Sequence, residues 1–155
     1  MNLKRLFPWF LLLVVASANG VFLENTNTPS LTLKRTLLGG FSGFFALSNW
    51  FEIEGKFQDW DELMLYAKIQ SATELDPQNL FYWVNGTAIL AHDHPAQNPT
   101  IDKLQSSLRA KRLLDRGLNH LPDHPVLLYE YGKLYLLKFE DAKTARSYFK
   151  QASAK

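Results

Sequence analysis

The tripeptide His92-Asp93-His94 brings two imidazoles and a carboxylate together, and these are side chains that zinc and nickel bind. A metal site needs more ligands than these neighbouring residues supply, and the sequence places no further ligand near the tripeptide. Two histidines separated by one residue also arise often by chance. We therefore expect no metal site and interpret both histidines as part of a loop or a helix end.

Three acidic residues, Asp59, Asp61 and Glu62, gather where a helix is predicted to begin. Acids are favoured there because they cap backbone N–H groups and complement the helix dipole. A catalytic carboxylate pair is the weaker interpretation. The sequence has no cysteine and shows no glycine-rich phosphate loop, nucleophile elbow or triad spacing. We expect a protein that is not an enzyme and carries no cofactor.

A basic stripe marks one side of a long helix that is predicted to start near Asn98 or Thr100 and to end at about Leu121. It consists of Arg109, Lys111, Arg112 and Arg116. We interpret the stripe as a solvated face, and a surface for anionic lipid or an acidic partner is the alternative. The formal charge of +2 is too small to indicate nucleic-acid binding.

The helices that carry these groups follow a repeat. Residues at four matching positions recur 45 residues apart in the sequence, and a third copy follows. The sets are Leu65, Ile69, Ala72 and Pro77; Ala110, Leu114, Gly117 and Pro122; and Ala145, Phe149 and Ala152. Spacings of four and three place the first three positions on one helical face. Each set predicts the second helix of a pair, with a proline just beyond its end.

The first helix of each pair has a pattern of its own, in which a small residue lies between bulky ones. The sets are Phe44, Leu47, Ser48 and Phe51; Trp83, Gly86, Thr87 and Leu90; and Leu128, Tyr131, Gly132 and Tyr135. We expect Ser48 and Gly132 to be small because the second helix of the same pair crosses there.

The stretch from Pro122 to Ala152 resembles a tetratricopeptide repeat (TPR) at every signature position but one. The departure is an extra residue in the turn around Glu140-Asp141. The resemblance covers about residues 41–155. It implies an all-α, right-handed superhelical array of about three helix pairs, with repeats at about 41–77, 78–124 and 125–155. It also implies a scaffold that binds other proteins.

A narrower likeness concerns Gly39-Gly40-Phe41-Ser42-Gly43, which is similar to the first helix of bacterial membrane-anchored TPR proteins. This likeness implies fold and location only. The apolar run 37–53 is interpreted as a repeat helix rather than a membrane span, because glycines, serines, Asn49 and Glu52 interrupt it.

A hydrophobic segment opens the chain. Lys4 and Arg5 precede the apolar run from Leu6 to Ala18, and residues 16–18 have the small-x-small form of a signal peptidase site. A membrane anchor from Leu6 to Leu23 is the favoured hypothesis, a cleaved signal is the alternative, and a buried cytosolic helix is a third. The first two place the repeats outside the cytoplasm, on the periplasmic side. Residues 24–40 are expected to form a linker and a lead-in helix.

The second repeat is 45 residues long, against about 34 in a standard unit, with the excess around residues 92–99. Adaptation of the array is the favoured interpretation, and a loop that contacts a partner is the alternative.

In a TPR array the first helix of each pair lines the concave side. The predicted groove therefore contains Phe45, Asn49, Phe81, Val84, Ala88, Tyr129, Lys133 and Leu136. This surface is mostly apolar, so an amphipathic helix or an extended apolar peptide is the expected partner. We also expect Tyr131, Tyr135 and Phe149 to leave apolar surface at the C-terminal edge, where a second copy could bind.

These observations predict a non-catalytic scaffold, exported and tethered to a membrane, that binds a partner protein in an envelope assembly. The alternative is a structural accessory subunit of an integral membrane complex. Apolar residues on the outer side of the first helix would favour that alternative.

Overall fold

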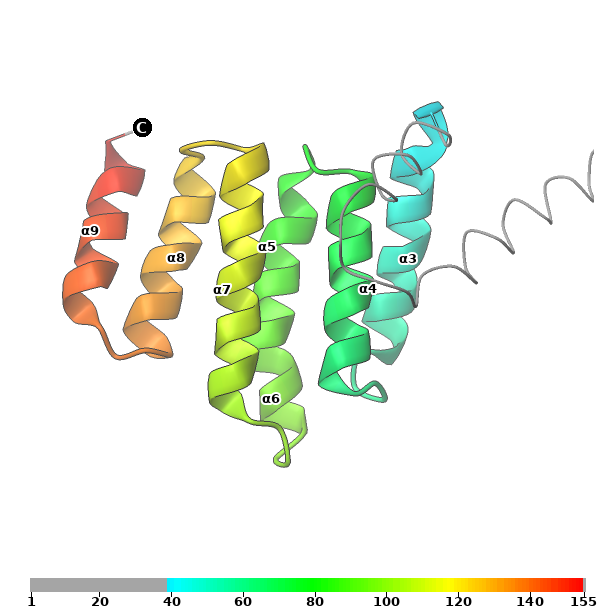
Figure 1. Ribbon diagram of the computed structural model, residues 1–155, viewed down its shortest axis with the longest axis horizontal. Helices are drawn as coiled ribbons and strands as arrows, with labels where there is room; N and C mark the ends of the chain where they lie inside the picture. Colours follow the sequence, from blue (N-terminus) through cyan, green and yellow to red (C-terminus); the bar gives the residue numbers. More distant parts are fainter. Residues whose placement is uncertain (1–38, 155) are drawn as a thin grey trace, which may run out of the picture. The chain divides into compact units, whose positions relative to one another are not determined.

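The computed structural model describes residues 39–154, and every regular element in that range is helical (Figure 1). The elements are a 3-10 turn η1 (Gly39–Phe41), α3 (Ser42–Lys56), α4 (Glu62–Leu75), α5 (Leu80–Ala88), a π-helical stretch η2 (Ile89–Asp93), α6 (His94–Gln97), α7 (Lys103–His120), α8 (Pro125–Leu137) and α9 (Ala142–Ser153). The prediction of an all-α fold is confirmed for this part of the chain.

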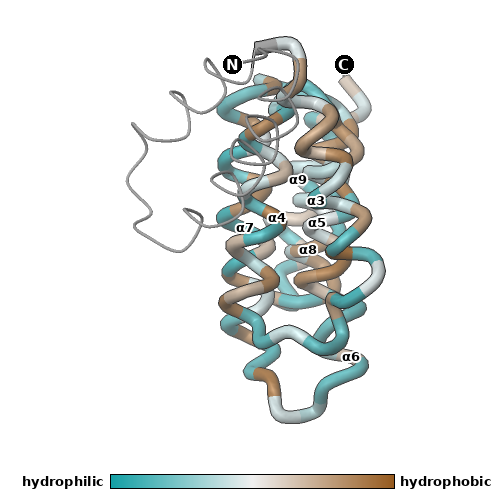
Figure 2. The backbone as a smooth tube through the Cα atoms, turned by 90° about the vertical axis from the view of Figure 1, so that its right-hand side faces the viewer, coloured by the Kyte–Doolittle hydropathy of each residue, from teal (hydrophilic) through white to brown (hydrophobic). Residues whose placement is uncertain are grey.

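The helices pack as consecutive pairs. The closest packing joins α3 to α4, α5 to α7, and α8 to α9. Further contacts join α4 to α7 and α5 to α8, so each pair stacks on the next. The first helices α3, α5 and α8 lie in one layer, and α4 and α7 lie in the other (Figure 2).

Side-chain caps explain where most of the helices begin. The carboxylates of Asp61, Asp102 and Asp141 accept hydrogen bonds from backbone N–H groups in the first turns of α4, α7 and α9. Asn79 caps α5 in the same way. Such caps satisfy N–H groups that have no partner within the helix. The long helix α7 is thus capped by Asp102 and begins at Lys103, whereas the sequence predicted a cap at Asn98 or Thr100.

Two glycines permit the closest helix contacts. A Cβ on Gly132 would collide with the ring of Phe149 on α9, as expected from the sequence. A Cβ on Gly86 would collide with Ile69 of α4 and would lie 3.0 Å from Leu113 of α7. Both positions lie where a larger side chain would push neighbouring helices apart.

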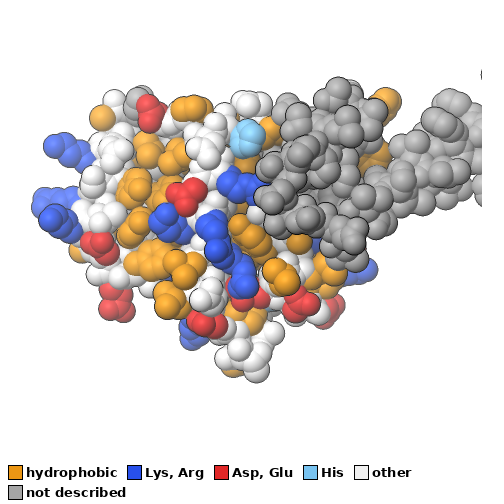
Figure 3. Space-filling view, in the orientation of Figure 1, with side chains coloured by type: hydrophobic (Ala, Val, Ile, Leu, Met, Phe, Trp, Pro, Cys, Tyr) orange, Lys and Arg blue, Asp and Glu red, His pale blue; other side chains and the backbone are white. Residues whose placement is uncertain are grey.

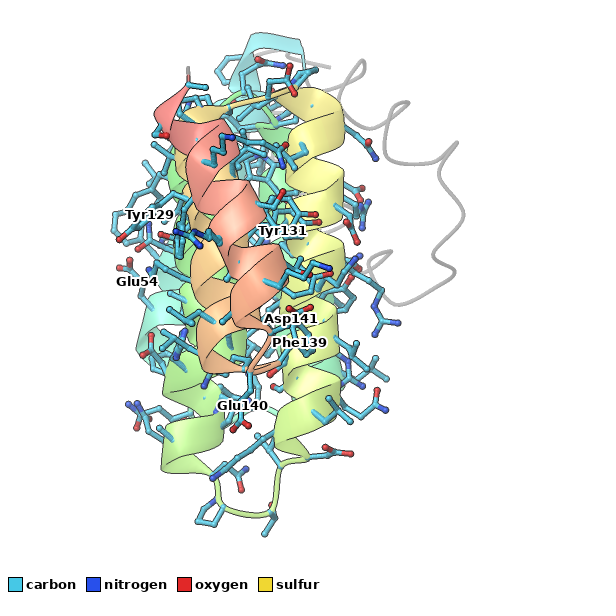
Figure 4. The ribbon with its side chains drawn as sticks, turned by 90° about the vertical axis from the view of Figure 1, so that its left-hand side faces the viewer. Glu54, Tyr129, Tyr131, Phe139, Glu140 and Asp141 are labelled. Carbon is cyan, nitrogen blue, oxygen red and sulfur yellow. The ribbon has the colours of Figure 1, made fainter. Side chains whose placement is uncertain are left out.

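The turn between α8 and α9 contains the extra residue noted in the sequence. Glu140 adopts a φ of 54°, in the left-handed region, and the N–H of Asp141 donates to the carbonyl of Tyr135 at 3.0 Å. Figure 4 shows Phe139, Glu140 and Asp141 together at this turn. The additional residue is therefore absorbed locally.

The prediction for α3 is wrong about which of its faces packs. The second helix of the pair was expected to cross at Ser48, yet Ser48 is exposed, and the flanking Phe44 and Phe51 are 67% and 63% exposed. The buried residues are Ala46, Trp50 and Ile53, on the opposite side of the helix. Both sets have helical spacing, and in the structure it is the indole of Trp50 that packs against the rings of Phe81 and Tyr82 on α5.

The insertion in the second repeat is helical. It continues α5 through η2 and α6, and His94 and Pro95 are buried. Nε2 of His94 lies 2.9 Å from the carbonyl oxygen of Trp60, in the turn between α3 and α4. Asp93, Ala96, Gln97 and Pro99 are exposed, so the segment has one side packed on the helices and one side open.

Within residues 39–154, no helix is both long and apolar enough to cross a membrane. The run 37–53, where the structure describes it, belongs to η1 and α3. The predicted anchor from Leu6 to Leu23, and all but the last two residues of the lead-in segment 24–40, lie outside the described residues.

Candidate partner-binding surface

The outward side of α5 and α8 carries most of the predicted groove residues. Phe81 is 46% exposed, Tyr129 is 52% exposed and Leu136 is 44% exposed, although each is large and apolar or aromatic. Val84, Ala88 and Lys133, on the same two helices, are half-buried. Figure 4 shows Tyr129 on the same side of the molecule as Glu54 of α3, and Tyr131 on the other side.

Two predicted groove residues on α3 do not line this surface. Phe45 is half-buried and packs against the core, with its ring centroid 5.9 Å from that of Phe44. The amide of Asn49 donates a hydrogen bond of 2.9 Å to the carbonyl of Lys68 on α4. The prediction fails at both positions for the same reason, namely that α3 turns a different face to the core than its sequence pattern suggested.

Phe81 is held in place by an aromatic cluster. Its ring centroid lies 5.3 Å from that of Trp50, with the two planes at 72°, and 5.6 Å from that of Tyr82. Edge-to-face contacts of this kind fix the orientation of a ring while leaving one side open. Phe81 therefore presents a preoriented apolar surface.

Tyr129 is held in a similar way at the other end of the surface. Its ring lies 5.4 Å from that of Phe149, and the ammonium of Lys133 lies 5.9 Å from its centroid. Lys133 also forms a salt bridge of 2.8 Å with Glu130. Beside Tyr129, an open hollow is lined by Pro125, Val126, Tyr129, Phe149, Ala152 and Ser153. The lining is mainly apolar.

The basic stripe of α7 is largely engaged in ion pairs. Arg109 lies 2.5 Å from Glu62, and Arg116 contacts Glu74, both acids being on α4. Lys111 pairs with Asp115 at 3.1 Å. Lys and Arg side chains lie among Asp and Glu side chains over this face (Figure 3). The two arginine pairs join α7 to α4, and the Lys111 pair lies within α7, so these three cations mainly support the structure and offer little free charge to an acidic partner.

The two candidate metal ligands do not converge. His94 is fully buried and its Nε2 lies against the carbonyl of Trp60, whereas His92 is half-exposed. Burial lowers the pKa of His92, and the nearby ammonium groups of Lys138 and Lys133 lower it further. The described part of the chain contains no group of three residues that could hold a metal ion.

A polar contact that the sequence did not predict lies between α7 and α8. The hydroxyl of Tyr131 donates to the carboxylate of Asp115, and the ring of Tyr131 stacks on that of Tyr148 at 4.7 Å. Burial raises the pKa of the Tyr131 phenol, and the hydrogen bond and charge of Asp115 raise it further. The group is therefore a neutral, structural tyrosine. Spacing within one helix gives no signal for such a contact between helices.

No family model matches the chain, and neither the curated proteins nor the solved structures contain a match to it.

Proposed function

We propose that this protein is a non-catalytic scaffold whose helix pairs form a right-handed TPR-type array and bind a partner protein. The observation that carries the proposal is the exposure of Phe81, Tyr129 and Leu136 on one layer of helices. Rigid aromatic residues that are half-exposed and held by neighbouring rings are typical hot spots of protein interfaces.

The chemistry of this surface favours an apolar ligand. Its cation, Lys133, is already neutralised by Glu130, so it is poorly placed to hold a terminal carboxylate. An amphipathic helix, or an extended peptide with apolar side chains, would cover the exposed rings. Truncation of either aromatic residue is expected to cost about 2 kcal/mol of binding free energy.

From the N-terminal sequence we propose that the scaffold lies in the cell envelope. In this proposal the segment from Leu6 to Leu23 anchors the chain and the repeats lie on the periplasmic side, with a secreted form after cleavage as the alternative. A reporter enzyme that is active only outside the cytoplasm, fused after Lys155, should be active. Mass measurement of the mature protein separates the two forms, because a chain that begins at Asn19 has been cleaved.

The test of the binding surface compares two double variants of the full chain, purified in mild detergent. Phe81→Ala with Tyr129→Ala removes the proposed hot spots. Leu63→Ala with Leu104→Ala removes two exposed leucines, 67% and 57% exposed, from α4 and α7 in the other layer. Proteins that co-purify with the wild type should be lost from the first variant and kept by the second.

Retention of the same co-purifying proteins by the Phe81/Tyr129 variant would refute the groove assignment. Unfolding of that variant would show instead that the two rings belong to the core. Circular dichroism at matched concentrations distinguishes these results.

A second candidate function is a structural subunit of an integral membrane complex. It is favoured by one observation, the exposure of Phe44, Leu47 and Phe51 on the side of α3 that faces away from the array. In that case co-purification would depend on these three residues and would survive the Phe81/Tyr129 changes.

A further inference from the structure

The outer face of α3 is apolar, uncharged and regular. Its residues recur at spacings of three and four, so they form one stripe opposite the buried side of the helix. The stripe consists of Phe44, Leu47, Ser48, Phe51 and Gly55. Phe44, Leu47 and Phe51 are 67%, 43% and 63% exposed, and no atom lies within 4 Å of a Cβ built on Gly55. The helix therefore presents large side chains alternating with open small positions.

This stripe is complementary to itself when two copies run antiparallel. If Phe44 of one copy lies at the level of Gly55 of the second, then Phe51 lies at the level of Ser48 of the second copy. A two-fold axis repeats both contacts. Every phenyl ring then meets a small residue, which is how close helix pairs interlock. A two-fold interface requires this kind of self-complementarity.

The charges on α3 favour the same antiparallel direction. Glu52, Glu54 and Lys56 lie in its C-terminal half, and the part from Ser42 to Phe51 has no charge. The first turn of α3 has no side-chain cap. In the antiparallel arrangement Glu54 of each copy lies within about one turn of the other copy's helix N-terminus, where a negative charge is favoured. A parallel pair would bring the acidic halves together.

We propose that the outer face of α3 is a homodimer interface in which two copies of this chain pair α3 antiparallel about a two-fold axis. This inference is independent of the binding surface on α5 and α8. A membrane surface fits the face less well, because interfacial helices carry rows of Lys and Arg. On α3 the one cation is Lys56, and the neighbouring Lys68 of α4 is paired with Glu52 at 2.7 Å.

The size of the interface sets the expected affinity. A 15-residue helix is about 22 Å long, and one helix pair covers less than the roughly 800 Å² per partner of a standard interface. We therefore expect a reversible dimer that dissociates on dilution, and a chemical cross-link is the appropriate probe.

Cysteine cross-linking tests the arrangement directly, because the chain has no cysteine of its own. Full-length Phe44→Cys and Gly55→Cys proteins, with distinguishable tags, are purified in mild detergent and oxidised separately and together. The two thiols should form a mixed disulfide dimer. Neither variant should cross-link to itself, because like residues of the two copies lie about 16 Å apart along the axis, beyond the ~7 Å limit for Cα atoms in a disulfide.

A second pair and a control make the result decisive. Ser48→Cys mixed with Phe51→Cys should also give the mixed dimer. Ser147→Cys, on the exposed side of α9, should give about tenfold less dimer, because its thiols meet only by diffusion. All five substituted positions are exposed, so the variants should keep wild-type helicity.

Three outcomes would overturn the proposal. Self-cross-linking of Phe44→Cys without the mixed product would show a parallel pair. A dimer from Ser147→Cys alone would move the contact to the C-terminal end. Absence of any dimer, with the Ser48→Cys thiol protected from maleimide in a monomer, would show that the chain's own residues or the detergent cover the face.

Discussion

The two ends of the described array differ in what they show to the surroundings. At the C-terminal end, α9 presents Lys143, Arg146, Ser147 and Lys150, all exposed. At the other end, α3 presents an uncharged stripe with two phenyl rings more than 60% exposed. A polar outer helix is the usual way in which repeat arrays remain soluble at an end. By this criterion α9 has the polar outer face expected of an end helix, and α3 does not.

The residues inside the C-terminal helix pair are also well covered. Tyr131, which was expected to leave apolar surface at the C-terminal edge, is 1% exposed and bonded to Asp115. Phe149 is half-buried against Gly132 and Tyr129. The residues that suggested a second copy at the C-terminal edge are thus largely used inside the last pair. Of the two end helices of the described range, α3 is the one with large apolar side chains more than 60% exposed, namely Phe44 and Phe51.

The largest expected difference in unfolding free energy between the two ends comes from adding one methyl group at each end. Gly132→Ala places a Cβ in the ring of Phe149, and overpacking of this kind should destabilise the protein by about 1–3 kcal/mol. Gly55→Ala meets open space on α3, and alanine should stabilise a helix there by about 0.5–1 kcal/mol. Urea unfolding of both variants measures the two free energies. Equal effects would mean that the ends are packed alike.

A smaller effect is expected from the hydroxyl that fastens α8 to α7. Tyr131→Phe removes the hydrogen bond to Asp115 and should cost about 1 kcal/mol of unfolding free energy. Tyr129→Phe is the matched control on the exposed side of the same helix, and should leave stability unchanged. A loss in the control equal to that in Tyr131→Phe would show that the Asp115 contact contributes nothing.

The raised pKa of Tyr131 predicts that the stability of the protein depends on pH in the alkaline range. The folded protein holds the pKa of Tyr131 above its ordinary value, whereas an unfolded tyrosine ionises near pH 10. The contribution of Tyr131 to stability is therefore complete below about pH 10 and is lost as the pH rises above it. Urea unfolding between about pH 9 and pH 11 should show a steeper fall for wild type than for Tyr131→Phe. Parallel curves would contradict the raised pKa.

The sequence predicted the helix pairs well because their signals are local. Apolar spacing of three and four, Pro77 and Pro122 beyond helix ends, and the small residue at 132 each describe a single helix or its nearest neighbour. Such patterns report secondary structure and close approach directly.

Contacts between helices could not be predicted in the same way. Two stripes on α3 have equal helical spacing, and only packing against α4 and α5 decides that Trp50 is buried and Phe51 is exposed. The predicted positions of Phe45 and Asn49 were wrong for the same reason, because both depend on which stripe of α3 is buried. The ion pairs of Arg109 and Arg116 with α4 likewise depend on how two helices are aligned.

A weaker effect on stability is expected at the outer face of α3. Phe51→Ser changes a residue that no described helix covers, so the unfolding free energy of the monomer should change by no more than about 0.5 kcal/mol. The dimer fraction in light scattering should nevertheless fall. Ser147→Ala is a matched change on α9 and should alter neither quantity. A large loss of stability in Phe51→Ser would show that this face is packed within the monomer.

The smallest expected effect concerns the cap that starts α9, for which α3 has no counterpart. The carboxylate of Asp141 accepts hydrogen bonds from the N–H and the hydroxyl of Thr144, and these bonds lower the pKa of Asp141. In α3 the cap position is Phe41, which makes no side-chain bond. A lowered pKa means that the contribution to stability is present above the ordinary pKa of an aspartate and is lost as the pH falls through the folded value. Asp141→Asn keeps one acceptor oxygen but cannot titrate, so it should show a slightly shallower acid-induced loss of stability than wild type. In the wild type, the amides in the first turn of α9 should be less protected from hydrogen exchange at low pH than at neutral pH. The protection of the amides in the first turn of α3 should not change with pH. If the amides of α3 respond to acid as much as those of α9, the cap does not distinguish the two ends.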